Sequence, residues 1–214
     1  MEIIKRHIPK RINNPEERMT PAGIILHYVG NPGTTAAANA NYFHNVNARV
    51  SVNYVVDDRE AIELIPPDMK SYGTKSGEYN GKYIQIEMCH PDKSGRISEA
   101  TLENTVRLCR DLISRYGCRR VIRHYDATGK MCPLWYALHE SEWEELKERI
   151  LSGEDESMTK KPDNTPSEWA KEAVKWAVER GVLRGDENGN LRLSDAVTRE
   201  EAVTFIYRCW QLIK

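Results

Sequence analysis

A polar segment that contains two prolines, Ser152–Pro166, divides this chain of 214 residues into two unequal parts. The segment has no apolar periodicity, and its composition is typical of a linker between folded units. We therefore predict a first domain over residues 1–151, a linker over residues 152–164 and a second unit over residues 165–214. A domain of about 150 residues can bury a substantial core, whereas about 50 residues are few for independent stability.

Composition excludes several classes of function. With 40% hydrophobic and 29% charged residues and a net charge of −1, the chain lacks the basic stripe of a nucleic-acid-binding protein. No apolar run approaches the length of a membrane-spanning helix, so we expect no membrane insertion. The N-terminal residues 1–7 lack the apolar core of a secretory signal. We therefore expect synthesis in the cytoplasm without a signal peptide, and action elsewhere only after release by another system.

The first part mixes strand and helix patterns. The alternation of apolar and polar residues indicates strands, and apolar residues every three or four positions indicate helices. The strands predicted in this way are Ile24–His27, Val50–Asp57, Ala61–Ile65 and Tyr83–Cys89. The predicted helices are Thr34–Val46, Ser98–Tyr116 and one that carries His139, Trp143, Leu146 and Ile150 on one face. Because these elements interleave without strict βαβ regularity, we predict an α/β fold with a central mixed sheet flanked by helices.

The second unit reads as a small α-helical domain of two helices. One apolar stripe contains Trp169, Ala173, Trp176 and Ala177, and the other contains Ala202, Val203, Ile206, Trp210 and Ile213. Between the two stripes lies a loop rich in turn-forming residues, Gly185–Asn190.

Three residues of the first part form a candidate metal site. His27 closes an apolar run, His124 ends another, and Cys132 follows His124 by eight residues through a sharp turn at Thr128-Gly129. Taken singly, each is an ordinary core or edge residue. The combination is more informative, because the loop between His124 and Cys132 could fold both donors onto one ion. Two imidazoles and one thiolate leave one tetrahedral position open, as in a catalytic zinc site.

The remaining candidates for metal ligands are weaker. The other histidines are His7, His44, His90 and His139; His44 and His90 have no partner at ligand spacing, and His139 is expected to line a helix face. The five cysteines are an odd number without a CxxC pair, which indicates reduced thiols rather than a disulfide framework. Glu87 on a polar strand face and Lys130 in a loop read as solvated charges unless they point at the metal.

Several segments resemble one family. They are Gly23–His27, Ser51–Asp58, Ile84–Cys89 and Arg123–Pro133. In this order they look like the zinc-dependent N-acetylmuramoyl-L-alanine amidases of type 2, which include phage endolysins and peptidoglycan recognition proteins. The resemblance covers most of residues 20–150, and its most specific part is the run from His124 through Lys130 to Cys132-Pro133.

The resemblance implies roles for five residues. His27, His124 and Cys132 would bind one Zn²⁺, Glu87 would be the general acid/base, and Lys130 would stabilise the oxyanion. It also implies the substrate, the amide between N-acetylmuramic acid and L-alanine in peptidoglycan. We predict a phage or prophage endolysin that acts on the cell wall after release. The alternatives are a non-catalytic peptidoglycan-binding receptor, a bacterial autolysin or wall-recycling amidase, and a wall-anchoring protein with an inert first domain.

The chain departs from the family pattern at three places. Many relatives have His where this chain has Asn53, and some use a tyrosine where it has Val52. Because Glu87 is present, the acid/base role falls on Glu87 rather than on position 52. At Ser71-Tyr72-Gly73, relatives often have Trp or His at the edge of the groove, so this segment gives no assignment of substrate contacts.

The second unit resembles one S-layer homology repeat. The resemblance rests on Trp169–Gly185, Asn190–Ser194 and Val197–Ala202. It implies binding to a secondary cell-wall polymer. Because such repeats usually occur in threes, a single repeat also leaves self-association through residues 165–214 open, as well as a helical hairpin that docks on the first domain.

Overall fold

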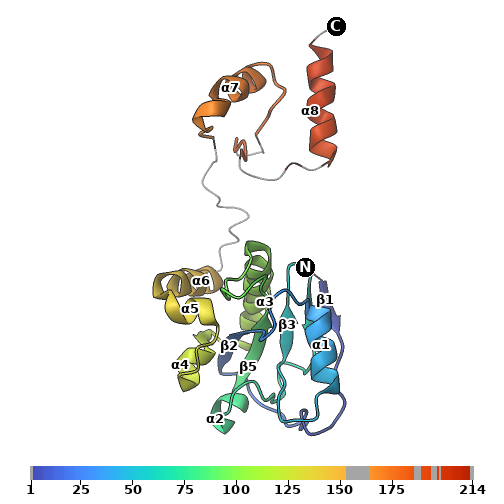
Figure 1. Cartoon of the computed structure of the whole chain (residues 1–214), viewed down its shortest axis with the longest axis vertical. Coiled ribbons are helices and arrows are strands. Elements are labelled where there is room, and N and C mark those ends of the chain that lie inside the picture. The colour runs from blue at the N-terminus through green and yellow to red at the C-terminus, as the bar shows by residue number, and fades with distance from the viewer. Residues whose placement is uncertain (1, 153–163, 186–188, 194–196, 198, 213–214) are drawn as a thin grey trace. The chain divides into compact units, whose positions relative to one another are not determined.

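A computed structural model describes residues 2–152, 164–185, 189–193, 197 and 199–212. The chain forms two compact units, Met1–Gly153 and Glu154–Lys214 (Figure 1). Residues 153–163 of the predicted linker lie outside the described residues, as do residues 186–188 of the turn-rich loop and Ile213. Within the described part of the chain, no helix is long and apolar enough to cross a membrane.

The first unit contains a mixed sheet of six strands. The strands are β1 (Glu2–Lys5), β2 (Gly23–Tyr28), β3 (Tyr54–Val56), β4 (Glu60–Glu63), β5 (Tyr83–Met88) and β6 (Arg120–Arg123). Their order across the sheet is β1-β4-β3-β5-β2-β6. All neighbours are parallel except β3 and β4, which form an antiparallel pair. The prediction of a mixed α/β sheet is therefore confirmed.

Helices cover both faces of this sheet. The helices of the first unit are α1 (Ala36–Asn45), α2 (Gly77–Asn80), α3 (Glu99–Tyr116), α4 (His124–Thr128), α5 (Leu134–Leu138) and α6 (Glu140–Ser152). Side chains of α3 and α6 pack with one face of β2 and β5 in a core that includes Leu26, Ile86 and Trp143. Side chains of α1 form a second core with the opposite face, where Phe43 and Cys89 are buried.

The ends of α3 follow from local chemistry. Ser98 is the N-cap, and its hydroxyl accepts a hydrogen bond from the backbone N–H of Thr101, which satisfies a donor that the helix leaves free. Gly117 ends the helix with φ +67°, a left-handed conformation that glycine adopts without steric cost. The predicted helix Ser98–Tyr116 with its stop at Gly117 is confirmed.

Two details of the predicted fold are wrong. His139 does not lie on the face of α6; it precedes that helix and stacks on Trp135, with 3.9 Å between ring centroids. The polar face of β5 is mostly covered by α1 and the segment around residue 73: Gln85 is fully buried on this face and Cys89 nearly so, while Glu87 is half-buried.

The second unit contains the two predicted helices, preceded by a short 3-10 turn. They are α7 (Lys171–Glu179) and α8 (Arg199–Gln211), and the turn, η1, spans Glu168–Ala170. The predicted apolar stripes do not form a core. Among the described residues of this unit, only Val182 and Asn190 are buried, while Trp169 and Ile206 are 89% and 70% exposed. The unit therefore presents apolar side chains that its own helices do not cover.

Candidate metal centre

The candidate metal ligands come from strand ends that meet at one edge of the sheet. Strand β2 lies between β5 and β6, and all three run in the same direction. His27 is in register with Glu87, and Leu26 is in register with Arg123, the residue before His124. The carboxyl ends of parallel strands are a common place for ligand sites. The register therefore brings His27, Glu87 and His124 together.

A short loop returns the chain from His124 to Cys132. Helix α4 begins at His124 and ends at Gly129, which has φ +77°. The loop is closed where the backbone N–H of Tyr125 donates to the carbonyl of Cys132, with 2.8 Å between N and O. The turn predicted at Thr128-Gly129 is thus present, and it places Cys132 beside His124.

The buried side chain of Arg123 fixes the start of this loop. Its guanidinium forms ion pairs with Asp126 of α4 (2.7 Å) and Glu140 of α6 (2.8 Å). It also donates to the carbonyl of Tyr136 (2.7 Å) and lies over the ring of Trp143. Arg123 was not singled out from sequence, because its partners lie in three different elements, α4, α5 and α6, and their meeting depends on the tertiary fold. Through these contacts, the position of His124 depends on α4, α5 and α6.

The three donors form a compact, buried cluster. His27, His124 and Cys132 are each at least 97% buried, and their ligand atoms lie within 4.8 Å of one another. His27 Nδ1 is 3.8 Å from Cys132 Sγ, and the two imidazole ring centroids are 4.6 Å apart. A tetrahedral zinc ion with ordinary bond lengths holds its ligand atoms about 3.3–3.6 Å apart. The cluster therefore fits zinc with only small adjustments.

One donor atom has no other use in the described structure. His124 Nδ1 is buried and has no hydrogen-bond partner among the described residues. A buried polar atom without a partner is costly, and a metal ion would satisfy it. Within the described part of the chain, the His27, His124 and Cys132 group is the one cluster of this kind that could hold a metal.

The protonation of the donors suits a metal. Burial, the neighbouring His124 and Lys130 lower the pKa of His27 to about 3, and burial with Lys130 lowers the pKa of His124 to about 4. Both rings are therefore neutral near pH 7, as metal ligands must be. Burial, with a contribution from Glu87, raises the pKa of the Cys132 thiol to about 12, so binding of a metal as thiolate must release one proton.

Glu87 lies beside the cluster with an unsatisfied carboxylate oxygen. Its Oε2 atom is buried and lacks a hydrogen-bond partner among the described residues. Burial raises the pKa of Glu87 to about 8, although the Lys130 cation opposes this rise. A carboxyl group with a pKa in this range can both take up and release a proton near neutral pH. Of the two readings of Glu87, a solvated strand carboxylate or a group that faces the metal, its half-buried position with a buried Oε2 atom favours the second.

Lys130 is exposed, yet its charge reaches the whole cluster. Its ammonium group acts on the pKa values of His27, Glu87, His124 and Cys132, lowering each of them. The side chain therefore provides a positive charge at the solvent side of the buried donors.

The other histidines bind protein atoms elsewhere. His7 pairs with Glu63 at 2.7 Å, and His44 Nε2 lies 2.8 Å from the carbonyl of Arg6. Both ring nitrogens of His90 face backbone carbonyls, and His139 Nδ1 faces the carbonyl of Trp135. None of them belongs to the cluster that the described residues form.

At the departures from the family pattern, Val52, Asn53 and Ser71 are buried, while Tyr72 and Gly73 are half-buried. Asn53 donates to the carbonyls of Pro66 and Met69 and accepts from Ser71 Oγ and the backbone N–H of Gln85. Val52 packs in the core beneath α1. Gln85, which sequence reasoning missed, contacts His27 directly: its Oε1 atom lies 2.6 Å from His27 Nε2. Its only signal in the sequence was a polar residue two positions before Glu87.

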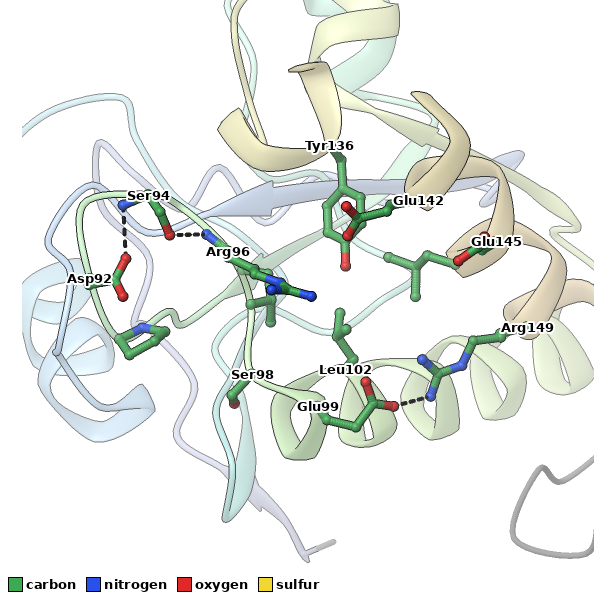
Figure 2. A pocket seen from close by; sticks show the side chains of 13 residues that line it. Asp92, Ser94, Arg96, Ser98, Glu99, Leu102, Tyr136, Glu142, Glu145 and Arg149 are labelled. Atoms are coloured by element: carbon green, nitrogen blue, oxygen red, sulfur yellow. Dashed lines mark hydrogen bonds and ion pairs between the residues drawn. The ribbon is translucent and has the colours of Figure 1, made fainter. Parts of the chain in front are cut away.

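A separate pocket of about 490 Å³ lies among α3, α5, α6 and the loop after β5 (Figure 2). Arg96 and Tyr136 point into it, and an ion pair between Glu99 and Arg149 (2.7 Å) closes one side. The pocket is lined by none of the candidate metal ligands and by neither Glu87 nor Lys130. It is therefore not the candidate site.

Comparison with known protein families identifies the first unit. The family model of the N-acetylmuramoyl-L-alanine amidases (Amidase_2) matches residues 17–135, more than half of the chain. The chain belongs to the N-acetylmuramoyl-L-alanine amidase family. The S-layer homology domain model matches residues 163–203 of this amidase-family chain, so both resemblances noted in the sequence are confirmed.

Characterised relatives share the sequence and the fold. The chain is 32% identical to the amidase CwlL of Bacillus licheniformis over 147 residues, which are 61% of this chain and 41% of CwlL. It is 25% identical to the amidase CwlA of Bacillus subtilis over 190 residues, which are 86% of this chain and 69% of CwlA. The structure of PlyL superposes with a TM-score of 0.65 and 29% identity over 72% of this chain and 99% of PlyL. The chain thus spans less than half the length of CwlL but nearly all of PlyL.

Proposed function

We propose that this chain is a zinc-dependent N-acetylmuramoyl-L-alanine amidase. The observation that carries the proposal is the buried cluster of His27, His124 and Cys132 with the carboxyl group of Glu87 beside it. Membership of the amidase family and the likeness to CwlL support the same activity. The substrate is the amide that joins the lactyl group of N-acetylmuramic acid to L-alanine in bacterial peptidoglycan.

Each residue of the site has a role in hydrolysis of this amide. Zinc held by the three donors would polarise the lactyl carbonyl and lower the pKa of a bound water. Glu87 accepts the proton of the attacking water and delivers it to the leaving nitrogen of L-alanine. The ammonium group of Lys130 stabilises the negative charge that develops on the carbonyl oxygen, an effect worth about 3 kcal/mol in comparable sites.

We further propose that the protein is a phage or prophage endolysin. A mutant endolysin from Bacillus subtilis superposes with a TM-score of 0.61 and 28% identity over 70% of this chain, which supports this origin. An autolysin or a wall-recycling amidase would use the same chemistry. Lysis of Gram-positive cells by protein added from outside, compared with cleavage of small muropeptides, separates a wall hydrolase from a recycling enzyme.

The activity is tested on purified Gram-positive peptidoglycan. An amidase releases new N-terminal L-alanine without new reducing sugar ends, and a chelator abolishes the release until zinc is restored. Wall binding without alanine release would instead identify a non-catalytic receptor. New reducing ends would identify a glycosidase, and either result would overturn the proposal.

We also propose that residues 165–214 associate with a second copy of the chain. Large apolar side chains of α8 are exposed, among them Val203 (66%), Ile206 (70%) and Tyr207 (58%). A small unit with so little buried apolar surface gains stability when a partner covers these side chains. The alternative, binding of a secondary cell-wall polymer, is supported by the match to the S-layer homology family.

Replacement of Ile206 with lysine is expected to shift the full chain toward monomer in sedimentation equilibrium, because it places a charge on the exposed apolar face. Alanine release from soluble muropeptides stays unchanged, since Ile206 lies outside the first unit. Glu172→Gln, which makes the net charge more positive by the same one unit by removing an exposed carboxylate of α7, is the control. If the wild type is monomeric at all concentrations but pulls down purified wall polymer, the polymer is the partner.

A further inference from the structure

Gln85 makes a direct contact with a candidate metal ligand. It lies on β5, two residues before Glu87 on the same face of the strand, and is fully buried. Its Oε1 atom is 2.6 Å from Nε2 of His27. The other ring nitrogen of His27, Nδ1, faces Cys132. Whether Nδ1 has a free lone pair for a metal depends on which ring nitrogen carries the proton.

The orientation of the nearby Asn80 is fixed by the backbone. Its Oδ1 atom is 2.9 Å from the N–H of Thr74, and its Nδ2 atom is 2.8 Å from the carbonyl of Thr74. A backbone N–H can only donate and a backbone carbonyl can only accept. The amide of Asn80 therefore cannot be reversed without breaking both hydrogen bonds, and its Oδ1 atom must be an acceptor.

Asn80 in turn fixes Gln85. Because Asn80 Oδ1 accepts hydrogen bonds, the group that faces it at 3.4 Å is the Nε2 amide of Gln85. The carbonyl oxygen of Gln85 is then left to face His27, and a carbonyl oxygen can only accept. His27 Nε2 must therefore carry the proton, which leaves the lone pair of Nδ1 directed toward Cys132.

The surrounding chain is shaped to hold Gln85. A Cβ atom at Gly73 would lie 2.7 Å from Oε1 of Gln85 and 2.9 Å from its Cδ, so a larger residue there would force the Gln85 side chain to shift. The backbone N–H of Gln85 donates to Asn53 Oδ1, which also accepts from Ser71. The segment Ser71-Tyr72-Gly73, to which the sequence assigned no role, thus encloses Gln85.

We propose that Gln85 is a positioning residue that sets the tautomer of His27. The backbone of Thr74 fixes the amide of Asn80, Asn80 fixes the amide of Gln85, and Gln85 fixes the proton of His27 on Nε2. The lone pair of Nδ1 is then available to a metal. Residues that orient a ligand in this way are worth about 10–100-fold in metal affinity. The metal ligand role rests on the proposed function, whereas the tautomer is a property of the metal-free protein.

The tautomer is measured by long-range ¹H–¹⁵N correlation spectra of the metal-free full chain in mildly alkaline buffer. Wild-type His27 is expected to show a proton on Nε2 alone. Gln85→Met, which keeps the length of the side chain but removes its polar atoms, is expected to give a mixture of tautomers. Gln85→Glu still accepts from Nε2 and is expected to restore the wild-type pattern. His44, whose Nε2 faces the carbonyl of Arg6, is the internal reference in every spectrum.

Zinc affinity, measured by competition with a chelating dye, is the second readout. Gln85→Met is expected to weaken it about 10–100-fold, and Gln85→Glu is expected to stay within a few-fold of the wild type. Asn80→Leu touches no candidate ligand and is expected to mix the tautomers of His27 as well, so it serves as the second variant if Gln85→Met does not fold.

Two results would overturn the proposal. One is a proton on Nδ1 of wild-type His27. The other is that the Gln85→Met and Asn80→Leu proteins keep both the single tautomer of His27 and the wild-type zinc affinity. Failure of the proposed function looks different. In that case the wild type binds no zinc, while the tautomer still changes in the variants.

Discussion

The Cys132→Ser protein is expected to lose both its zinc and its amidase activity. Cys132 supplies the one sulfur among the three buried donors, and a serine hydroxyl does not ionise at neutral pH to replace a thiolate. Removal of a residue that only orients a ligand lowers metal affinity by at most about 100-fold, and the loss in Cys132→Ser is expected to be larger. Elemental analysis of the purified protein and release of N-terminal L-alanine from peptidoglycan measure the two effects.

Another buried cysteine provides the matched control. Cys118 lies in the same domain, and its Sγ atom contacts the carbonyl of Leu112 rather than the cluster. Cys118→Ser is expected to retain one zinc per chain and wild-type activity. One zinc per chain and full activity in Cys132→Ser would show that this sulfur is not a ligand.

The Glu87→Gln protein is expected to keep zinc while its kcat falls about 10²–10⁴-fold. Glutamine has the shape of glutamate but cannot take a proton from water and pass it to the leaving nitrogen. The replacement leaves the three donors unchanged, so the loss is in chemistry rather than in metal binding. Zinc content and steady-state kinetics on a soluble muropeptide separate these two effects.

The stability of the metal-free Glu87→Gln protein gives an independent check. Folding raises the pKa of Glu87 from 4.5 to about 8, so ionisation is less favourable in the folded state, and the metal-free wild type loses stability as the pH rises through this range. Glutamine does not ionise, and the variant is expected to be the more stable of the two at pH 8.

Glu99→Gln, at an exposed ion pair with Arg149, is the control for kinetics. An unchanged kcat in Glu87→Gln would remove Glu87 from the mechanism.

The parts of the fold that the sequence predicted are those with long or strongly patterned elements. The 18 residues of α3 show a clear helical period, and β2 is a nearly continuous apolar run bounded by His27. The helices α2, α4 and α5 have only four or five residues each, which is too short for a period to emerge. Strand β1 lies at the edge of the sheet and is mostly exposed, and its two apolar residues, Ile3 and Ile4, are adjacent and show no alternation.

From residue types and spacing alone, only the donors of the candidate site were predictable, whereas Glu87 and Lys130 were named through the resemblance to the amidase family. His27, His124 and Cys132 could be named because their residue types and spacing suit a metal. The environment of Glu87 could not, since the burial of that strand face depends on side chains far away in sequence. Likewise the contact between Gln85 and His27 joins residues 58 positions apart, and its meaning depends on the backbone of Thr74. In the second unit, the apolar period correctly predicted helices, but the stripes of α7 and α8 stay largely exposed among the described residues of this unit.

The contacts of Arg123 set a lower limit on the size of a functional fragment. The match to the amidase family model ends at residue 135, which could suggest a boundary there. A protein truncated at that point would lack Glu140, which pairs with the buried guanidinium, and Trp143, over which it stacks. The strand end that presents His124 would then lose its anchor. A fragment that keeps this anchor must therefore extend into α6, at least past Trp143.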